Sequence, residues 1–338
     1  MASKEKESAV LADTTGFTGE RPDNSDQASS SGSDKDQIIY TPPESVSNES
    51  VPTHNLATAN ISFREYIYFL PYPLPPGTPV PYSTGLPENN PLNLPTHQFE
   101  PTNTLVLTSP NRTFVDIRFF KPVHAGAATI LPNKGERERL EWAFAGSSES
   151  HPVTSNHEKK EGEKWEGVTH STWTHWLDSR HSVSTPDIPV DEGDMYPIAS
   201  NLTLEHGHAF HPHLNAHKTH EEMWRDGDIR STTPAGTKIC IVLRLHADTA
   251  GVRGVIIRLG QYCQGIIMKD KHSTVERWEF DVQGNEDTKE SSKWKRTARI
   301  GDLLLPCSVT FRPEILAVGG SVRYHDYEWA VEEVWEWR

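Results

Sequence analysis

The chain has 338 residues, of which 35% are hydrophobic, and it carries a formal net charge of −14 at pH 7. This charge argues against a nucleic-acid binder, which needs a basic footprint to neutralise phosphates, and against docking on an anionic membrane surface. The low hydrophobic fraction predicts that part of the chain does not join a compact core.

The first segment, residues 1–59, consists largely of Ser, Asp, Glu, Lys, Asn and Thr. Such a composition cannot bury enough apolar surface to offset the entropy lost on ordering, so it predicts a disordered acidic tail whose removal leaves thermal stability nearly unchanged. The start, MASKEKESAV, lacks the apolar core of a secretory signal, and no apolar run reaches the length of about 18 residues that spans a bilayer. We therefore expect an intracellular protein without a membrane partner.

Order is expected to begin at Ile61–Leu70, where alternating aromatic and aliphatic residues predict a strand. The many prolines of residues 71–95 exclude a central strand and favour a long irregular loop. A hairpin is predicted next, with strands at Thr104–Thr108 and Phe114–Phe120 around a Ser-Pro-Asn-Arg turn.

Two tryptophan-rich segments follow, LEWAFAGSSES and HSTWTHWLDSR, and both predict barrel strands. In the first, alternation places Trp142 and Phe144 on one face and Glu141 on the other with the neighbouring alanines. In the second, Trp173 and Trp176 are an odd distance apart, so one is expected to line a core and the other an interface unless a bulge intervenes.

The order of these patterns is repeated in residues 236–338, where VIIR at Val255–Arg258 parallels VDIR at Val115–Arg118. We interpret the chain as two related all-β units, residues 60–200 and residues 236–338. The apolar faces of the two matched strands are expected to point into their barrels. Arg118 and Arg258 would then point outward, where they can pair with carboxylates across an interface without the cost of an unpaired buried charge.

Residues 201–235, between the two units, are dense in histidine and are interpreted as a connecting surface loop. Imidazoles can bind zinc, copper or nickel, so adventitious metal affinity and a genuine metal site are the alternatives, but the spacing matches no zinc signature. The residues concerned are His206, His208, His211, His213, His217, His220, Glu221 and Glu222.

Motifs for other chemistry are missing. The three cysteines, Cys240, Cys263 and Cys307, are widely spaced within or beside apolar runs, which predicts buried free thiols. There is neither a G-x-S-x-G elbow nor a glycine-rich phosphate loop that leads into a helix. No catalytic, cofactor-binding or metal-binding residue is therefore assigned.

The motifs LEWAFAGSSE, WLD, EEMWRD and VIIRLGQYCQGIIM occur in an order that resembles the fungal Hri family, over the chain from Ile61 onward. The resemblance implies two lipocalin-like antiparallel β-barrel domains, a cytoplasmic and nuclear location, a homodimer, and a link to a casein kinase I. It brings no established reaction, and the acidic tail, the proline-rich loop and the histidine-rich segment have no counterpart in its smaller yeast-type pattern.

Two functions follow from this interpretation. The first is a non-enzymatic interaction protein whose role is carried by its surfaces. The alternative is a barrel that binds or transforms a small molecule, because eight strands enclose room for one ligand. Arginines that point into a lumen and face an open cavity would favour the alternative.

Overall fold

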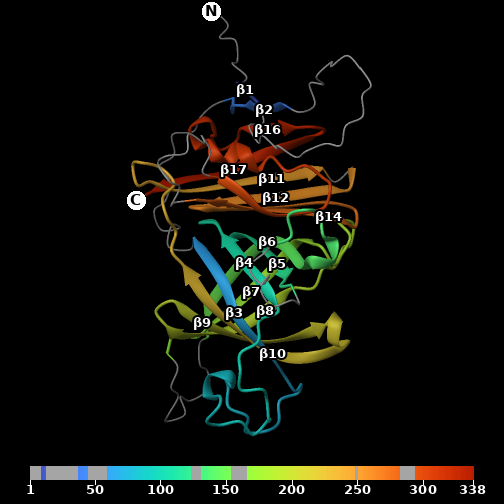
Figure 1. The fold of residues 1–338 in the computed structure, drawn as a ribbon, viewed down its shortest axis with the longest axis vertical. Coiled ribbons are helices and arrows are strands. Elements are labelled where there is room, and N and C mark those ends of the chain that lie inside the picture. The colour runs from blue at the N-terminus through green and yellow to red at the C-terminus, as the bar shows by residue number, and fades with distance from the viewer. Residues whose placement is uncertain are drawn as a thin grey trace, which may run out of the picture.

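The structure, a computed structural model, describes residues 9–12, 37–44, 59–122, 131–153, 166–247, 250–281 and 294–338. Within these ranges the protein is all-β, with short 3-10 turns as its only helices. A closed barrel and a second sheet lie one above the other (Figure 1). No helix among the described residues is both long and apolar enough to cross a bilayer.

The closed barrel is antiparallel and eight-stranded. Each strand pairs with its neighbour in the chain, and β10 pairs with β3 to close the ring. The strands are β3 (Asn60–Leu70), β4 (Thr102–Thr108), β5 (Thr113–Phe120), β6 (Leu140–Pro152), β7 (Thr169–Asp178), β8 (Asp191–Ala199), β9 (Leu202–His211) and β10 (Ala216–Gly227).

The second sheet has nine strands in the order β1-β2-β16-β17-β11-β12-β13-β14-β15, so β1 and β15 form its edges. Its strands are β1 (Ala9–Ala12), β2 (Gln37–Thr41), β11 (Lys238–Ala247), β12 (Val252–Leu259), β13 (Tyr262–Lys269), β14 (His272–Phe280), β15 (Trp294–Ile300), β16 (Ser321–Tyr324) and β17 (Tyr327–Trp337). The prediction of an all-β chain with a barrel is confirmed.

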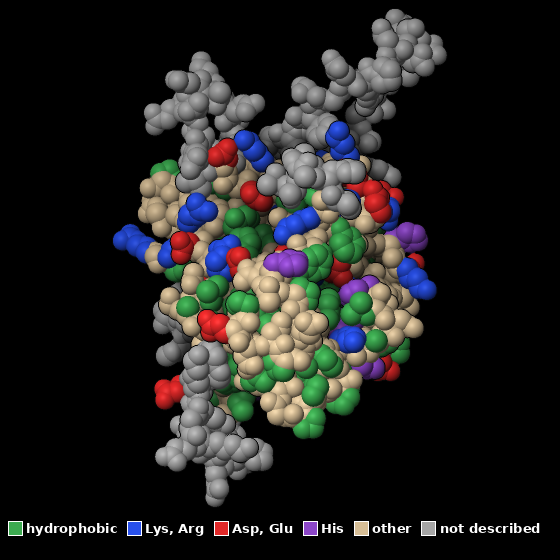
Figure 2. Space-filling model, turned by 60° about the horizontal axis from the view of Figure 1, so that its bottom comes forward, with side chains coloured by type: hydrophobic (Ala, Val, Ile, Leu, Met, Phe, Trp, Pro, Cys, Tyr) green, Lys and Arg blue, Asp and Glu red, His purple; other side chains and the backbone are tan. Residues whose placement is uncertain are grey.

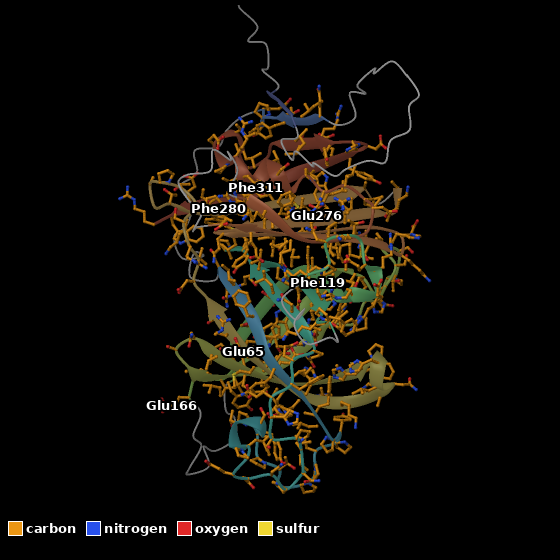
Figure 3. The ribbon with its side chains drawn as sticks, in the orientation of Figure 1. Glu65, Phe119, Glu166, Glu276, Phe280 and Phe311 are labelled. Carbon is orange, nitrogen blue, oxygen red and sulfur yellow. The ribbon has the colours of Figure 1, made fainter. Side chains whose placement is uncertain are left out.

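One apolar cluster holds the two sheets together. Val115, Ile117 and Phe119 of β5 and Val255, Ile257 and Leu259 of β12 are fully buried in this single cluster. Strands β12 and β13 lie directly against β4 and β5, and Phe119 is drawn at the junction (Figure 3). The expectation that these faces point into their own barrels is wrong, because each is covered by the other.

Polar side chains of the second sheet reach across the same junction. Gln264 donates to the carbonyl of Leu105 at 2.9 Å, and Arg277 donates to the carbonyl of Ile117 at 3.0 Å. Glu333 of β17, itself buried, accepts a 2.7 Å hydrogen bond from the Ser109 hydroxyl in the β4–β5 turn. These bonds attach the barrel to the second sheet and also fix the position of the barrel on that sheet.

The far face of the second sheet packs on its own apolar cluster, which includes Ile256, Cys263 and Trp329. Arg258 points to this side and is 1% exposed. It donates to the carbonyl of Thr310 and, at 2.7 Å, to the hydroxyl of Thr232. The expected outward orientation of Arg258 is therefore wrong.

The histidine-rich segment is not a connecting loop. Residues 202–211 and 216–227 are strands β9 and β10, and they complete the first barrel, which therefore extends to residue 227 instead of 200. The physical reason is that, among the described strands, β10 is the partner that covers the free edge of β3, and unpaired edges leave backbone groups unsatisfied.

Part of the expected disordered tail is also ordered. Residues 37–41 form β2, which pairs with β16 and buries Ile38 and Tyr40 against the second apolar cluster. The Tyr40 hydroxyl accepts a 3.0 Å hydrogen bond from the backbone N–H of Ala317. The rest of the tail, apart from β1, residues 42–44 and Ala59, lies outside the described residues.

The proline-rich segment, residues 71–95, covers the outside of the barrel on the side away from the second sheet (Figure 1). Its Tyr82 packs with Tyr66, Leu70 and Met223. Both carboxylate oxygens of Glu221 accept backbone N–H groups of this segment at 2.6 Å. The prediction of an irregular loop is confirmed, and the face that it forms is mainly apolar and uncharged (Figure 2).

Candidate functional site

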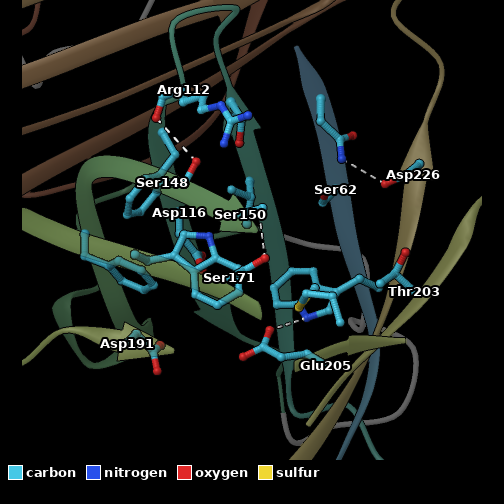
Figure 4. Close-up of a pocket in the computed structure, with 18 of the residues that line it drawn as sticks. Ser62, Arg112, Asp116, Ser148, Ser150, Ser171, Asp191, Thr203, Glu205 and Asp226 are labelled. Atoms are coloured by element: carbon cyan, nitrogen blue, oxygen red, sulfur yellow. Dashed lines mark hydrogen bonds between the residues drawn. The ribbon is translucent and has the colours of Figure 1, made fainter. Parts of the chain in front are cut away.

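The lumen of the closed barrel contains a cavity of about 370 Å³. It opens at the end of the barrel where β3 begins and β10 ends, and Figure 4 shows its lining. Side chains of Asp116 and Glu205 lie at its inner end, and Arg112 and Asp226 lie toward its mouth. Asn60 and Arg118 also line it. The volume falls in the range of small-molecule pockets.

Asp116 and Arg118 enter the lumen because β5 alternates. Its odd-numbered residues from Val115 to Phe119 are buried against the second sheet, so its even-numbered residues face the interior. Arg118 is 7% exposed and donates two hydrogen bonds to one oxygen of Asp116, at 3.0 and 2.8 Å. The expected outward orientation of Arg118 is thus also wrong.

Arg118 does not offer a free positive charge. Its guanidinium is shared between Asp116 and Glu222, whose carboxylate is 3.6 Å away. Glu222 also accepts a 2.7 Å hydrogen bond from Arg64, and it is 4% exposed. Burial would raise the pKa of Glu222, but the two guanidinium groups outweigh it and lower this pKa to about 2.

The aromatic wall of the lumen surrounds the same guanidinium. The guanidinium carbon of Arg118 lies 5.1, 5.3 and 5.9 Å from the ring centres of Trp142, Phe144 and Trp224, respectively. Such contacts stabilise a cation that has lost water. They also hold the rings in place, so the flat apolar ring faces of the lumen are preorganised.

One carboxylate oxygen in the cavity has no partner. Asp116 is 3% exposed, and its Oδ1 atom makes no hydrogen bond with the described residues. Burial raises the pKa of Asp116, although Arg118 opposes this shift. An unsatisfied buried acceptor is costly, and it is satisfied when a ligand brings a donor.

A histidine and a glutamate form a second buried polar pair. His220 Nε2 lies 3.6 Å from Glu205 Oε1, while the other oxygen of Glu205 accepts a 2.9 Å bond from the Trp224 indole. Burial raises the pKa of Glu205 and would lower that of His220, but the nearby carboxylates raise the His220 pKa overall. The pair can hold a proton deep in the barrel.

Two β-bulges in β6 and β7 decide which side chains reach the lumen. Register shifts after Arg118 and after Ala145 leave Glu141 and Trp176 as the extra residues. Glu141 is turned to the lumen beside Trp142, contrary to the simple alternation, whereas Ala143 and Ala145 face the junction as that alternation requires. A Cβ on Gly146 would lie 1.8 Å from the carbonyl oxygen of Thr174, so glycine is required there.

The expectation that Trp173 and Trp176 point to opposite faces of their strand is confirmed. Trp173 lines the lumen cavity. Trp176 packs on the second sheet, where the guanidinium carbons of Arg244 and Arg253 lie 4.6 and 5.2 Å from its ring centre.

The histidines do not converge on one point. Within the described part of the chain, no group of three or more His, Cys, Asp or Glu side chains is arranged to hold a metal ion. His206 hydrogen-bonds Glu221 on the outside, whereas His211, His213 and His220 line the other end of the lumen. Sequence reasoning grouped them by proximity in the chain, but strand alternation separates them.

The prediction of buried free thiols is confirmed for Cys240, Cys263 and Cys307. Burial raises the pKa of both Cys240 and Cys307 well above the ordinary value for a thiol. Neither is therefore prepared to act as a nucleophilic thiolate.

These features define an all-β protein with a closed barrel whose lumen is polar and whose outer wall is docked on a second sheet. The chain belongs to the family described as Protein HRI1, whose model matches residues 87–333. The resemblance carried by the sequence motifs is thereby confirmed.

The fold is similar to that of an uncharacterized protein from Saccharomyces cerevisiae. Its crystal structure aligns with a TM-score of 0.53 at 18% identity, over 82% of this chain and 99% of that chain. At this identity the likeness concerns the fold. No curated protein matches the chain.

Proposed function

We propose that the barrel binds a compact ring-shaped molecule with hydroxyl or amino donors, in the class of a monosaccharide or nucleoside, in the cavity beside Asp116. The observation that carries the proposal is the unpartnered Oδ1 of Asp116 at the inner end of an open cavity of about 370 Å³. A donor on the ligand would satisfy this oxygen.

The remaining lining suits such a molecule. Trp173, Trp224 and Phe144 offer flat faces for a ring, while serine and threonine hydroxyls of the same cavity provide both donors and acceptors. Because Arg118 is neutralised by its carboxylate neighbours, an inward arginine does not here indicate an anionic ligand. Donor-rich ligands fit better.

The proposal favours the ligand-binding alternative over a protein whose role is carried by surfaces alone. Self-association, a casein kinase I partner, and a cytoplasmic and nuclear location remain proposals that rest on the family resemblance. A lipocalin-like character for both domains is likewise proposed from the resemblance alone. Among the described strands, the strand order closes the first sheet into a barrel and does not close the second.

The test measures binding of glucose, glucosamine and adenosine to the full chain by ligand-observed NMR and calorimetry. Two variants disable the cavity in different ways: Asp116→Asn changes the unpartnered acceptor, and Ser148→Phe fills the lumen. Ser147→Phe is the matched control, because Ser147 is the exposed neighbour of the cavity-lining Ser148.

We expect at least one of the three probes to bind, and both cavity variants to weaken it at least about tenfold, the loss that corresponds to one hydrogen bond to a charged group. Ser147→Phe should bind as the unmodified chain does. Absence of binding by all three probes, or equal binding by Ser148→Phe, would show that the proposal is wrong.

A further inference from the structure

The opposite end of the same barrel contains a second cavity, of about 290 Å³. Arg118, Asp191 and Glu205 line both cavities, so a layer of charged side chains separates them. The proposed ligand of the first cavity makes no use of this second space.

The mouth of the second cavity is aromatic. Phe99, Phe120 and Phe210 all line it, and they are 55%, 41% and 49% exposed. They come from the residues between the proline-rich segment and β4, from β5 and from β9, so the fold gathers them from distant parts of the chain. Large exposed apolar side chains around a concave opening are typical of sites that bind an apolar group.

The inner wall carries a polar pair that the β6 bulge creates. One oxygen of Glu141 pairs with Arg180, whose guanidinium lies 3.9 Å from the ring centre of Trp142. The other oxygen, Oε2, is buried and has no hydrogen-bond partner among the described residues. The bulge therefore places Glu141, which carries one unsatisfied acceptor, in the wall of this cavity.

Two further pairs of charged or ionisable groups in the wall are already formed. Arg64 bonds Glu222, and His220 faces Glu205. His211 is uncharged near neutral pH, because burial and then the charge of His220 lower its pKa to about 4. The free capacity of the cavity is thus an apolar mouth together with carboxylate acceptors on Glu141 and Asp191.

We propose that this cavity is a second binding site, for a small molecule with an aromatic or aliphatic body at the phenylalanine mouth and one hydrogen-bond donor on Glu141 Oε2. An alcohol or an amine meets this requirement. A carboxylate of the same shape does not, because it would place a second negative charge beside Glu141. The site is independent of the ligand proposed for the first cavity.

Three probes with the same phenyl body test the proposal on the full chain: 2-phenylethanol, 2-phenylethylamine and phenylacetate. Binding is measured by saturation-transfer NMR. Glu141→Gln replaces the acceptor carboxylate, with Glu138→Gln at an exposed site as its control. Ala209→Phe fills the second cavity and leaves Glu141 in place, whereas Ser148→Phe fills the first cavity.

We expect the alcohol and the amine to bind at least tenfold more tightly than phenylacetate. Glu141→Gln and Ala209→Phe should each weaken this binding at least tenfold, and Glu138→Gln and Ser148→Phe should not change it. The inference is overturned if no probe binds at millimolar concentration, if phenylacetate binds best, or if Ser148→Phe alone abolishes binding, which would place the probes in the first cavity. Loss of sugar or nucleoside binding in Ser148→Phe with phenyl binding intact would separate the two sites.

Discussion

At the scale of single residues, Glu222 is the anion on which two buried guanidinium groups depend, those of Arg64 and Arg118. Glu222→Gln removes the carboxylate that both guanidinium groups share, although Arg64 keeps Glu100 and Arg118 keeps Asp116. It should therefore lower the free energy of unfolding by roughly 3 kcal/mol, the lower end of the cost of breaking a buried ionic group. The pKa of Glu222 is lowered from 4.5 to about 2 on folding. Its contribution is therefore present above about pH 4.5 and is lost as the pH falls toward 2. Urea unfolding of both proteins between pH 2 and 7 measures this difference, which should shrink as the pH falls.

Glu65→Gln is the control, since Glu65 pairs with Arg225 on the outside of β3 and both side chains are well exposed (Figure 3). Exposed pairs contribute about 1 kcal/mol or less. A Glu222→Gln protein as stable as the control at pH 7 would mean that the ion pairs of Glu222 with Arg64 and Arg118 do not stabilise the fold.

At the scale of one element, β2 shows how a short strand in a polar segment can still be structural. Ile38 and Tyr40 are 2% and 5% exposed, and their burial contributes roughly 4 kcal/mol if each is counted as a fully buried large side chain. A chain that begins at residue 45 should therefore melt several degrees lower than the full chain. A chain that begins at residue 37 keeps β2 and should lose much less. Differential scanning calorimetry of the two truncations compares them.

This expectation replaces the sequence-based one, that loss of residues 1–59 has little effect. Equal melting temperatures for the two truncations would restore the earlier view and would mean that β2 adds no net stability. A Tyr40→Ala variant of the full chain provides a check without truncation, because it removes the contact with Ala317 and leaves the strand.

At the scale of the whole molecule, the barrel and the second sheet share one apolar cluster and should unfold together. Val115 lies on the barrel side of this cluster and Val255 on the other, and neither is exposed. Val115→Asp and Val255→Asp each place a charge in the junction, so each should lower the melting temperature of both parts at once. Calorimetry should give a single transition whose calorimetric and van't Hoff enthalpies agree. Val318→Asp, at a 55% exposed site, should leave it unchanged.

Two separate transitions in the unmodified chain would contradict this expectation. So would a Val255→Asp protein in which the barrel still melts at its original temperature. Glu333→Gln gives a milder test, since it weakens the acceptor for Ser109 and keeps the apolar cluster intact.

Much of the fold could be predicted from local pattern. The hairpin of β4 and β5, the tryptophan strands β6 and β7, and the irregular proline-rich segment all follow from alternation and turn residues. Strands β9 and β10 could not be found in this way. Their lumen side carries Glu205, His220 and Glu222, so their sequence lacks the apolar alternation that predicts a half-buried strand.

For the candidate site, the sequence indicated some of the residues but not how they are arranged. Arg118 was assigned to the outward face of its strand, and Glu222 to the histidine-rich segment, but no sequence feature placed these two side chains together. Their meeting depends on the closure of the barrel by β10 and β3, which pair residues far apart in the chain. The position of Glu141 depends on a bulge, for which alternation gives no signal.

By itself, the sequence determined the family, the all-β class, and which side chains of β5 and β12 share a face, because those properties are encoded in local order and in a period of two residues. Tertiary structure alone decided which face is the inside. A strand pattern is symmetrical with respect to its two sides, and the usual assumption is that the apolar side fills the barrel. Here the second sheet covers Val115, Ile117 and Phe119 from outside, so the apolar side is buried without entering the lumen. The interior is left to Asp116, Arg118 and the cavities that they line.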